Sequence, residues 1–300
     1  MRLADQPPET RNLFKRQDVF RCRHMSHARF SYTVSVHHVM EEKGCHPEGC
    51  IYLRWSCKKI QKQEKCPRGY RHAGRKCGGC QHFYDIKEAY RPELVLKGSA
   101  RDDFFTHYRH FKWWVDEIEG TRVSFFGRVA LLKPCYVKIV RKRGEFFRSR
   151  GLLAVFHKGY IGRTHFQDRL YLNLTRSESE RLQIFEGQEL EGEAQLSIDR
   201  GRFILSRPRR MAMAQQKQSS DHHYLDLMLR IGSKTFRDQP ERCVACSRGI
   251  LVDVLDGEDN QRFLGRELLC LEGVASPKDC LIGTDVKDRL ERCARERHSA

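Results

Sequence analysis

Short runs of alternating apolar and polar residues fill the middle of the chain, between residues 121 and 207. Glycines and charged residues separate the runs, so each is predicted to be a β-strand of a small barrel or sandwich. The five runs are TRVSFFGRVALL, GLLAVFHKGYIG, RLYLNL, ELEGEAQLSID and GRFILSRP. Between the third and fourth runs, SESERLQIF predicts a short helix. Five strands with a helix at this position resemble the OB arrangement, a fold pattern that does not define a function.

An amphipathic helix is predicted over residues 99–118, just before these strands. Ser99 and Asp102 have the spacing of a capping box, and apolar side chains then recur at helical spacing. This face, which we expect to dock on a neighbouring domain, consists of Phe104, Phe105, Tyr108, Phe111, Val115 and Ile118. Residues 28–40 alternate and predict a further strand.

These patterns predict a mainly β protein with some α: an OB-like five-stranded barrel flanked by two small Cys-rich, zinc-ribbon-like or knuckle-like modules. Six segments follow from them. They are a flexible basic arm (1–27), a Cys-rich metal-binding module (28–98), a connecting helix (99–119), the barrel (120–210), a linker with a short helix at 221–231 (211–240) and a ribbon-like module with a final helix at 285–297 (241–300). The first Cys-rich segment has few aliphatic residues, so we expect it to need a metal to fold.

Positive charge is concentrated in two parts of the chain. The net charge is +17, and residues 1–80 carry 17 Lys and Arg against 7 Asp and Glu, while residues 121–210 carry 19 against 9. The remaining segments are close to neutral. A polyanion such as nucleic acid is therefore expected to bind the first cysteine cluster and the predicted barrel.

The cysteines are distributed in two clusters. Six of the thirteen lie within residues 45–80 and five within residues 243–293. No segment has the roughly 18 consecutive apolar residues of a membrane helix, and the N-terminus lacks an apolar signal-peptide core. We therefore expect a cytoplasmic or nuclear protein that does not bind membranes, in which clustered thiols are metal ligands rather than disulfides.

The C-terminal cluster resembles a zinc ribbon. A Cys-x2-Cys knuckle is followed by two strand-like runs, GILVDVLD and RFLGRELLC, that would return a second pair of thiols to the first. The predicted ligands are Cys243, Cys246, Cys270 and Cys280. The gap between Cys270 and Cys280 is longer than ribbons usually have, so Cys293 competes as the fourth ligand.

The N-terminal cluster has more thiols than one ion needs. One predicted zinc site is formed by Cys57, Cys66, Cys77 and Cys80, the last two being a knuckle flanked by glycines. Cys45 and Cys50 would join Cys22, with His24 or His46, in a second site. Alternatively, Cys45, Cys50, Cys57 and Cys66 would hold a [4Fe–4S] cluster, although their spacing matches no common ferredoxin run. Two or more zinc ions are the favoured prediction.

A basic segment, KIVRKRGEFFRSR, separates the first and second strand-like runs. In an OB barrel this loop flanks the binding face, where cations neutralise phosphates and aromatic rings stack on bases. The predicted nucleic-acid contacts are Lys138, Arg141, Lys142, Arg143, Phe146, Phe147, Arg148 and Arg150, together with Arg163 from beyond the second run. Arg169, Arg200 and Arg202 would extend this patch.

Enzyme signatures are missing from the sequence. It contains no phosphate-binding glycine loop, no Gly-x-Ser-x-Gly elbow and no His-Glu pair at metalloprotease spacing. The leading hypothesis is a non-catalytic protein that binds single-stranded DNA or RNA and is stabilised by zinc. The alternatives are an iron–sulfur protein or subunit of a nucleic-acid-processing or redox enzyme, and a protein–protein adaptor.

Overall fold

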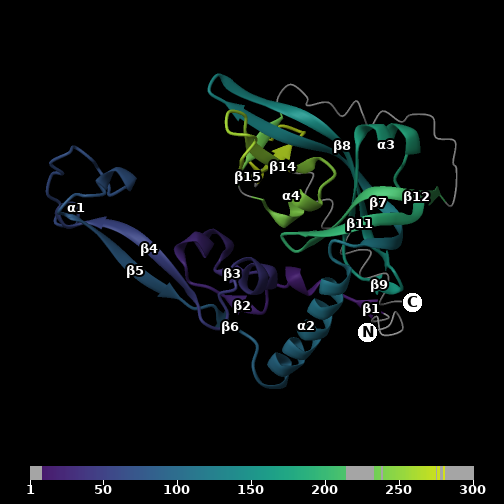
Figure 1. The fold of residues 1–300 in the computed structure, drawn as a ribbon, viewed down its shortest axis with the longest axis horizontal. Helices are drawn as coiled ribbons and strands as arrows, with labels where there is room; N and C mark the ends of the chain where they lie inside the picture. Colours follow the sequence, from purple (N-terminus) through teal and green to yellow (C-terminus); the bar gives the residue numbers. More distant parts are fainter. Residues whose placement is uncertain (1–8, 214–232, 238, 275, 278–279, 281–300) are drawn as a thin grey trace. The chain divides into compact units, whose positions relative to one another are not determined.

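The computed structural model describes residues 9–213, 233–237, 239–274, 276–277 and 280 (Figure 1). Within these residues the chain is mainly β, as predicted, and it divides into two compact units. One unit runs from Asn12 to Trp113, and the other is formed by the residues on either side of it. The boundary falls inside helix α2 (Gly98–Ile118), so this helix contributes to both units. The predicted six segments are a finer division and stay a prediction.

The larger unit contains a mixed sheet of ten described strands, in the order β1-β9-β8-β10-β12-β11-β7-β14-β15-β13. Its elements are β1 (Glu9–Thr10), β7 (Arg122–Arg141), β8 (Gly144–Ile161), β9 (Thr164–Phe166), β10 (Leu170–Leu174), α3 (Arg176–Leu182), β11 (Glu189–Asp199), β12 (Arg202–Met213), β13 (Lys234–Phe236), α4 (Glu241–Ala245), β14 (Gly249–Asp256) and β15 (Phe263–Cys270).

Five of these strands pair in a closed series, which we call the five-strand ring. β7 pairs antiparallel with β8, and β8 pairs antiparallel with β10. β10 pairs in parallel with β12, β12 pairs antiparallel with β11, and β11 returns to β7. Helix α3 connects β10 to β11 and begins with a capping box between Thr175 and Glu178. The short helix predicted between the third and fourth runs is therefore confirmed.

An apolar core is buried along the strands of this ring. Leu172 of β10 is paired with Ala154 of β8 and Leu205 of β12, and all three side chains are fully buried. The indole of Trp114, from the C-terminal part of α2, is also fully buried and stacks 5.8 Å from the ring of Phe203. Burial of this much apolar surface is the main stabilising contribution to the ring.

Gly151 of β8 allows the close approach of β8 to the end of β10. Its backbone has a φ of +126°, and a Cβ atom at this position would lie 2.0 Å from the carbonyl oxygen of Leu174. A side chain has no room there, so the local geometry requires glycine.

β14 and β15 form the antiparallel hairpin predicted near the C-terminus, which we call the C-terminal hairpin. β14 joins the mixed sheet because it pairs in parallel with residues 137–140 of β7. A small apolar cluster packs at this junction and consists of Tyr136, Ile250, Val252, Leu269 and Leu271. The hairpin is therefore part of the larger unit and packs on β7.

The unit from Asn12 to Trp113 contains a three-stranded sheet, in the order β3-β2-β6, and a separate two-stranded hairpin of β4 and β5. Its elements besides α2 are η2 (Leu13–Lys15), β2 (Phe20–Arg21), η3 (Met25–Phe30), β3 (Thr33–Val34), η4 (His38–Glu42), β4 (Cys50–Cys57), α1 (Lys58–Gln61), η5 (Arg75–Cys77), β5 (Phe83–Tyr90) and β6 (Glu93–Leu94). In α2, five of the six predicted apolar-face residues are buried, namely Phe104, Tyr108, Phe111, Val115 and Ile118.

The strand predicted over residues 28–40 is wrong in most of its length. Only Thr33–Val34 is a strand, preceded by η3 and followed by the single helical turn η4. Ser31 and Tyr32 have φ values of 54° and 62°, a left-handed conformation that interrupts an extended backbone. The helices predicted over 221–231 and 285–297 lie outside the described residues. Among the residues that are described, no helix combines the length and apolar character needed to cross a membrane.

Candidate functional site

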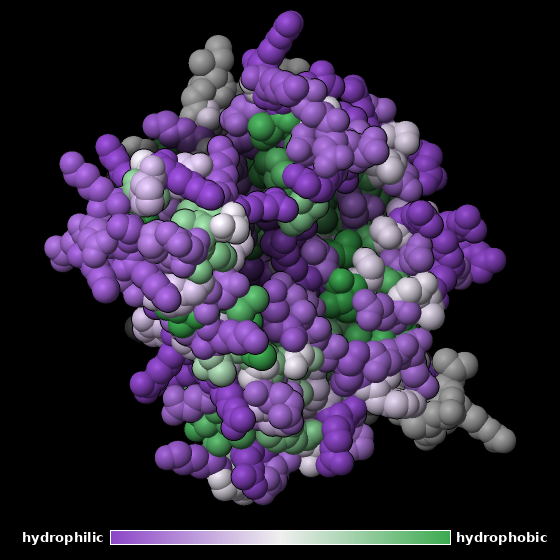
Figure 2. Space-filling model, turned by 60° about the vertical axis from the view of Figure 1, so that its left-hand side comes forward, coloured by the Kyte–Doolittle hydropathy of each residue, from purple (hydrophilic) through white to green (hydrophobic). Residues whose placement is uncertain are grey.

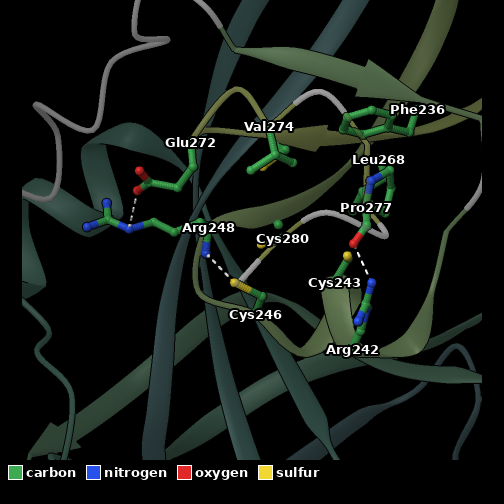
Figure 3. A pocket seen from close by; sticks show the side chains of 12 residues that line it. Phe236, Arg242, Cys243, Cys246, Arg248, Leu268, Glu272, Val274, Pro277 and Cys280 are labelled. Atoms are coloured by element: carbon green, nitrogen blue, oxygen red, sulfur yellow. Dashed lines mark hydrogen bonds and ion pairs between the residues drawn. The ribbon is translucent and has the colours of Figure 1, made fainter. Parts of the chain in front are cut away.

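Four cysteines of the C-terminal segment line one small cavity of about 20 Å³. They are the four predicted ligands: Cys243 from α4, Cys246 just after it, Cys270 at the end of β15, and Cys280 beyond the hairpin. Figure 3 shows Cys243, Cys246 and Cys280 around this space. The strand register contributes to this arrangement, because Cys270 is paired with Gly249, three residues after Cys246.

Backbone and side-chain contacts hold the segments that carry these thiols. The N–H of Arg248 donates to Sγ of Cys246 at 3.4 Å, a contact expected where a chain turns its amides toward a sulfur. The Arg242 guanidinium donates to the carbonyl oxygen of Pro277, three residues before Cys280 (Figure 3). A Cβ atom on Gly249 would lie 1.9 Å from the carbonyl oxygen of Cys243, so glycine is required for the knuckle to approach β14.

The other three thiols of this cavity influence the ionisation of Cys243. Burial raises the pKa of the Cys243 thiol; Arg242 opposes this effect, and the neighbouring Cys280, Cys246 and Cys270 add to it. Thiolates that repel one another in this way are stabilised by a bound cation.

The donor set of this cavity fits a zinc ion. Four thiols are the ligands of a closed, structural zinc site, and the cavity has about the space of one water molecule. Among the described residues, no group of three or more His, Cys, Asp or Glu is placed so that it could hold a metal ion. A zinc ion in this cavity would require the sulfurs to move closer together, as happens where metal binding and local folding are coupled. Cys293 lies outside the described residues.

The second predicted ligand set lies at one end of the β4–β5 hairpin. Cys57 ends β4, and Cys66, Cys77 and Cys80 belong to the residues that connect it to β5. Backbone N–H groups of Arg68 and Tyr70 donate toward the Cys66 sulfur and lower its pKa. The Gly74 N–H donates to Sγ of Cys77 at 3.5 Å. Amides directed at both sulfurs are compatible with metal-binding knuckles.

The additional thiols of the N-terminal cluster lie near the other end of this hairpin. Burial raises the pKa of the Cys45 thiol, and the nearby Cys50 and Cys22 raise it further. Of the two histidines predicted to complete this site, His46 stacks 5.7 Å from the ring of Phe105. The ring of His24 packs instead at 4.7 Å from both Tyr52 and Tyr90 of the hairpin.

The basic segment after residue 138 is a regular hairpin, not the loop that we predicted. β7 and β8 continue to Arg141 and Gly144, which pair across a two-residue turn. Lys138 is buried and forms ion pairs of 2.9 and 3.0 Å with Glu145 and Glu267. Its charge is therefore compensated inside the protein, which argues against a role in phosphate binding.

The other predicted contacts in this hairpin differ in their exposure. Lys142, Arg143 and Arg163 are exposed at turns. The guanidinium of Arg141 lies 5.2 Å from the exposed Phe146 ring. Phe147 packs on the apolar cluster that contains Tyr136, and Arg148 donates to Gln261 at 3.2 Å. Only part of the predicted patch is thus available to a ligand.

A larger cavity of about 350 Å³ lies between the five-strand ring and the C-terminal hairpin. Every strand of the ring contributes to its lining, and the lining includes cations, aromatic rings and amides. Its polar and aromatic lining residues include Lys133, Tyr136, Arg150, Tyr171, Asn173, Asp199, Arg202, Asp253 and Arg266. Of these, the sequence prediction included only Arg150 and Arg202. Period-two alternation in β10 could have indicated Tyr171 and Asn173, which lie between the buried Leu170, Leu172 and Leu174.

Ion pairs and hydrogen bonds fix the charged walls of this cavity. Asp199 accepts from Arg202 at 2.5 Å and from Arg266 at 2.7 Å. Burial opposes ionisation of Asp199, but the charges of the two arginines outweigh it and lower the pKa of this carboxyl. The buried Lys133 ammonium donates to the carbonyl oxygens of Val244 and Gly249, at 2.5 and 3.0 Å.

Comparison with protein families, with curated proteins and with solved structures finds no match in any of the three.

Proposed function

We propose that this chain is a non-catalytic protein that binds single-stranded nucleic acid through the five-strand ring, which we interpret as an OB-type barrel. The order of the strands supports this interpretation, because α3 lies between the third and fourth of the five. In OB barrels, oligonucleotides bind the face of the second and third strands, between the loops that join strands one to two and four to five. Here these strands are β8 and β10.

The observation that carries the proposal is the position and lining of the larger cavity. Arg150 of β8 and Tyr171 and Asn173 of β10 line it, which supports a position on the face that OB barrels use for binding. Arg150 is exposed, whereas Tyr171 is buried and the Arg202 guanidinium lies 5.6 Å from the centroid of its ring. A cation next to an aromatic ring and an amide can bind a phosphate and a base at the same point.

Zinc has a structural role in this proposal. The C-terminal thiols Cys243, Cys246, Cys270 and Cys280 would hold one ion and fix the hairpin that borders the cavity. Cys57, Cys66, Cys77 and Cys80 would hold another at the end of the β4–β5 hairpin. Four protein ligands leave no open position for a substrate, which fits a binding protein better than an enzyme. No described feature favours the iron–sulfur or adaptor alternatives over this one.

The test compares two arginine variants of the full chain in an oligonucleotide-binding titration. Arg150→Ala removes an exposed cation at the cavity, whereas the control Arg181→Ala removes an exposed cation on α3, outside the cavity. We expect Arg150→Ala to weaken binding of a fluorescent 20-nucleotide single strand roughly tenfold and to reduce the slope of log K against log salt by about 0.7. If both variants bind like the parent protein, the nucleic acid does not cross this face.

A further inference from the structure

The β4–β5 hairpin exposes an apolar row on one face. Ile51, Leu53 and Trp55 are 73%, 51% and 47% exposed, and alternation along β4 places them on the same side. Their cross-strand partners, Ala89, Lys87 and Asp85, are exposed as well. No other described strand pairs with this hairpin. Hydrophilic side chains cover most of the face drawn in Figure 2, so a continuous apolar row on one strand points to a binding surface.

The opposite face of the same hairpin is occupied by contacts within the protein. Tyr52 packs against His24, and Arg54 forms an ion pair of 3.2 Å with Glu88. Glu88 also accepts a hydrogen bond of 2.5 Å from the Tyr90 hydroxyl. His24 therefore packs on this face, against Tyr52 and Tyr90, and the row of Ile51, Leu53 and Trp55 lies on the other face.

The residues that connect the two strands, 58–82, form a strongly cationic tip. Figure 1 shows α1 there, at the far end of the β4–β5 hairpin from the three-stranded sheet. Eight Lys and Arg residues stand against one acidic residue, Glu64, which pairs with Lys59 at 3.2 Å. Every other cation of the tip is exposed, namely Lys58, Lys62, Lys65, Arg68, Arg71, Arg75 and Lys76. Such a high density of positive charge, on a segment that also carries the predicted ligands Cys66, Cys77 and Cys80, favours a polyanion as binding partner.

We propose that the β4–β5 hairpin and its tip form a second nucleic-acid contact, which we call the arm. Cations of the tip bind phosphates, and unpaired bases pack on Leu53 and Trp55. This inference rests on the proposed function and adds a site to it. The charge of the tip favours nucleic acid over an apolar protein partner, and the aromatic ring of Trp55 favours single strands, whose bases are free to stack.

Two sets of variants test the arm in the whole chain, purified with zinc in the buffer. Lys62→Ala, Arg71→Ala and Arg75→Ala are combined to remove tip cations. The matched control combines Lys97→Ala, Arg101→Ala and Arg109→Ala, which removes three exposed cations elsewhere in the same unit. We expect the tip variant to bind a single-stranded 20-mer at least tenfold more weakly, with the slope of log K against log salt reduced by about 2, and the control to change neither.

A second experiment tests the apolar row directly. Trp55→Ala is expected to weaken binding about tenfold, and Trp55→Phe to restore most of it, because a stacking surface is retained. Photocrosslinking with a 5-iodouridine oligonucleotide should attach the label to the peptide that contains Trp55. Zinc content and circular dichroism establish that each variant is folded.

The outcomes separate this inference from the proposed function. If Arg150→Ala weakens binding and the arm variants do not, the arm is not a contact and the OB proposal stands. If the arm variants weaken binding and Arg150→Ala does not, the arm is a nucleic-acid contact and the proposed binding face of the barrel is not. A dimer that is lost on Trp55→Ala, without any change in oligonucleotide binding, would show that the row docks a second copy of the chain and would overturn the inference.

Discussion

The guanidinium of Arg266 in β15 lies 2.7 Å from the carboxylate of Asp199, at the end of β11. The same guanidinium lies 2.6 Å from Asp253 of β14, and its side chain is only 11% exposed. This largely buried cation joins the C-terminal hairpin to the fourth strand of the ring and forms one wall of the larger cavity.

Removing Arg266 is expected to destabilise the larger unit. Arg266→Ala leaves Asp253 without this partner and leaves Asp199 with Arg202 alone. We expect a loss of about 2 kcal/mol in the free energy of unfolding, less than a fully buried pair would lose because both carboxylates are partly exposed. Urea denaturation provides the measurement. The control Arg262→Ala removes a side chain that is 67% exposed, and its effect should stay below about 0.5 kcal/mol. Equal losses in the two variants would contradict this role of Arg266.

The buried Lys133 is expected to make the free energy of unfolding depend on pH in the alkaline range. Burial lowers its pKa from 10.5 to about 8, whereas in the unfolded chain it keeps its proton up to the ordinary value. Between these two values the unfolded state binds more protons, so stability rises with pH, by about 3 kcal/mol for this group alone. Cysteine ionisation also acts in this range, so the quantity to measure is the difference between the parent protein and Lys133→Met. That difference should grow in favour of the parent from pH 8 to 10.5. Lys158→Met, at an exposed lysine of β8, is the control for the loss of a lysine side chain.

Two glycines of the C-terminal hairpin are expected to respond differently to alanine. At Gly249 a Cβ atom would meet the Cys243 carbonyl oxygen at 1.9 Å, whereas at Gly265 no atom lies within 4 Å of the added carbon. Gly249→Ala should displace the knuckle and lower both thermal stability and zinc content. For Gly265→Ala we expect both quantities to match the parent protein, since only the neighbouring backbone is affected. A Gly249→Ala protein with full zinc content would mean that the cavity of Cys243 and Cys246 is not the metal site.

The number of zinc ions bound per chain tests the C-terminal site through its predicted ligands, without a change in the backbone. Cys246→Ser is expected to reduce the bound zinc by about one equivalent per chain, measured by atomic emission after anaerobic purification. Cys135→Ser changes a thiol that lines the larger cavity, away from the four-thiol space, and should leave zinc unchanged. Iron in place of zinc, with absorption near 400 nm, would instead support the iron–sulfur alternative.

Local patterns were sufficient to predict some elements, and long-range pairing determined the rest. The shared cavity of the four C-terminal cysteines was predictable because a knuckle followed by a strand, a turn and a second strand returns Cys270 next to Gly249. The basic loop was mispredicted because β7 and β8 stay paired up to Arg141 and Gly144, and β14 adds a parallel pairing with residues 137–140 of β7. Nothing in the local sequence indicates this parallel pairing. For the same reason Lys133 and Arg266 could not be assigned to one cavity beforehand.

The most direct test of the central claim is the salt dependence of single-stranded oligonucleotide binding by the zinc-loaded protein. Fluorescence anisotropy between 50 and 200 mM salt gives the slope of log K against log salt, with a duplex of the same sequence as comparison. We predict measurable binding of the single strand at about 50 mM salt, a slope of roughly −2 to −4 for three to five neutralised phosphates, and weaker binding of the duplex. No binding of the single strand at low salt would contradict the account.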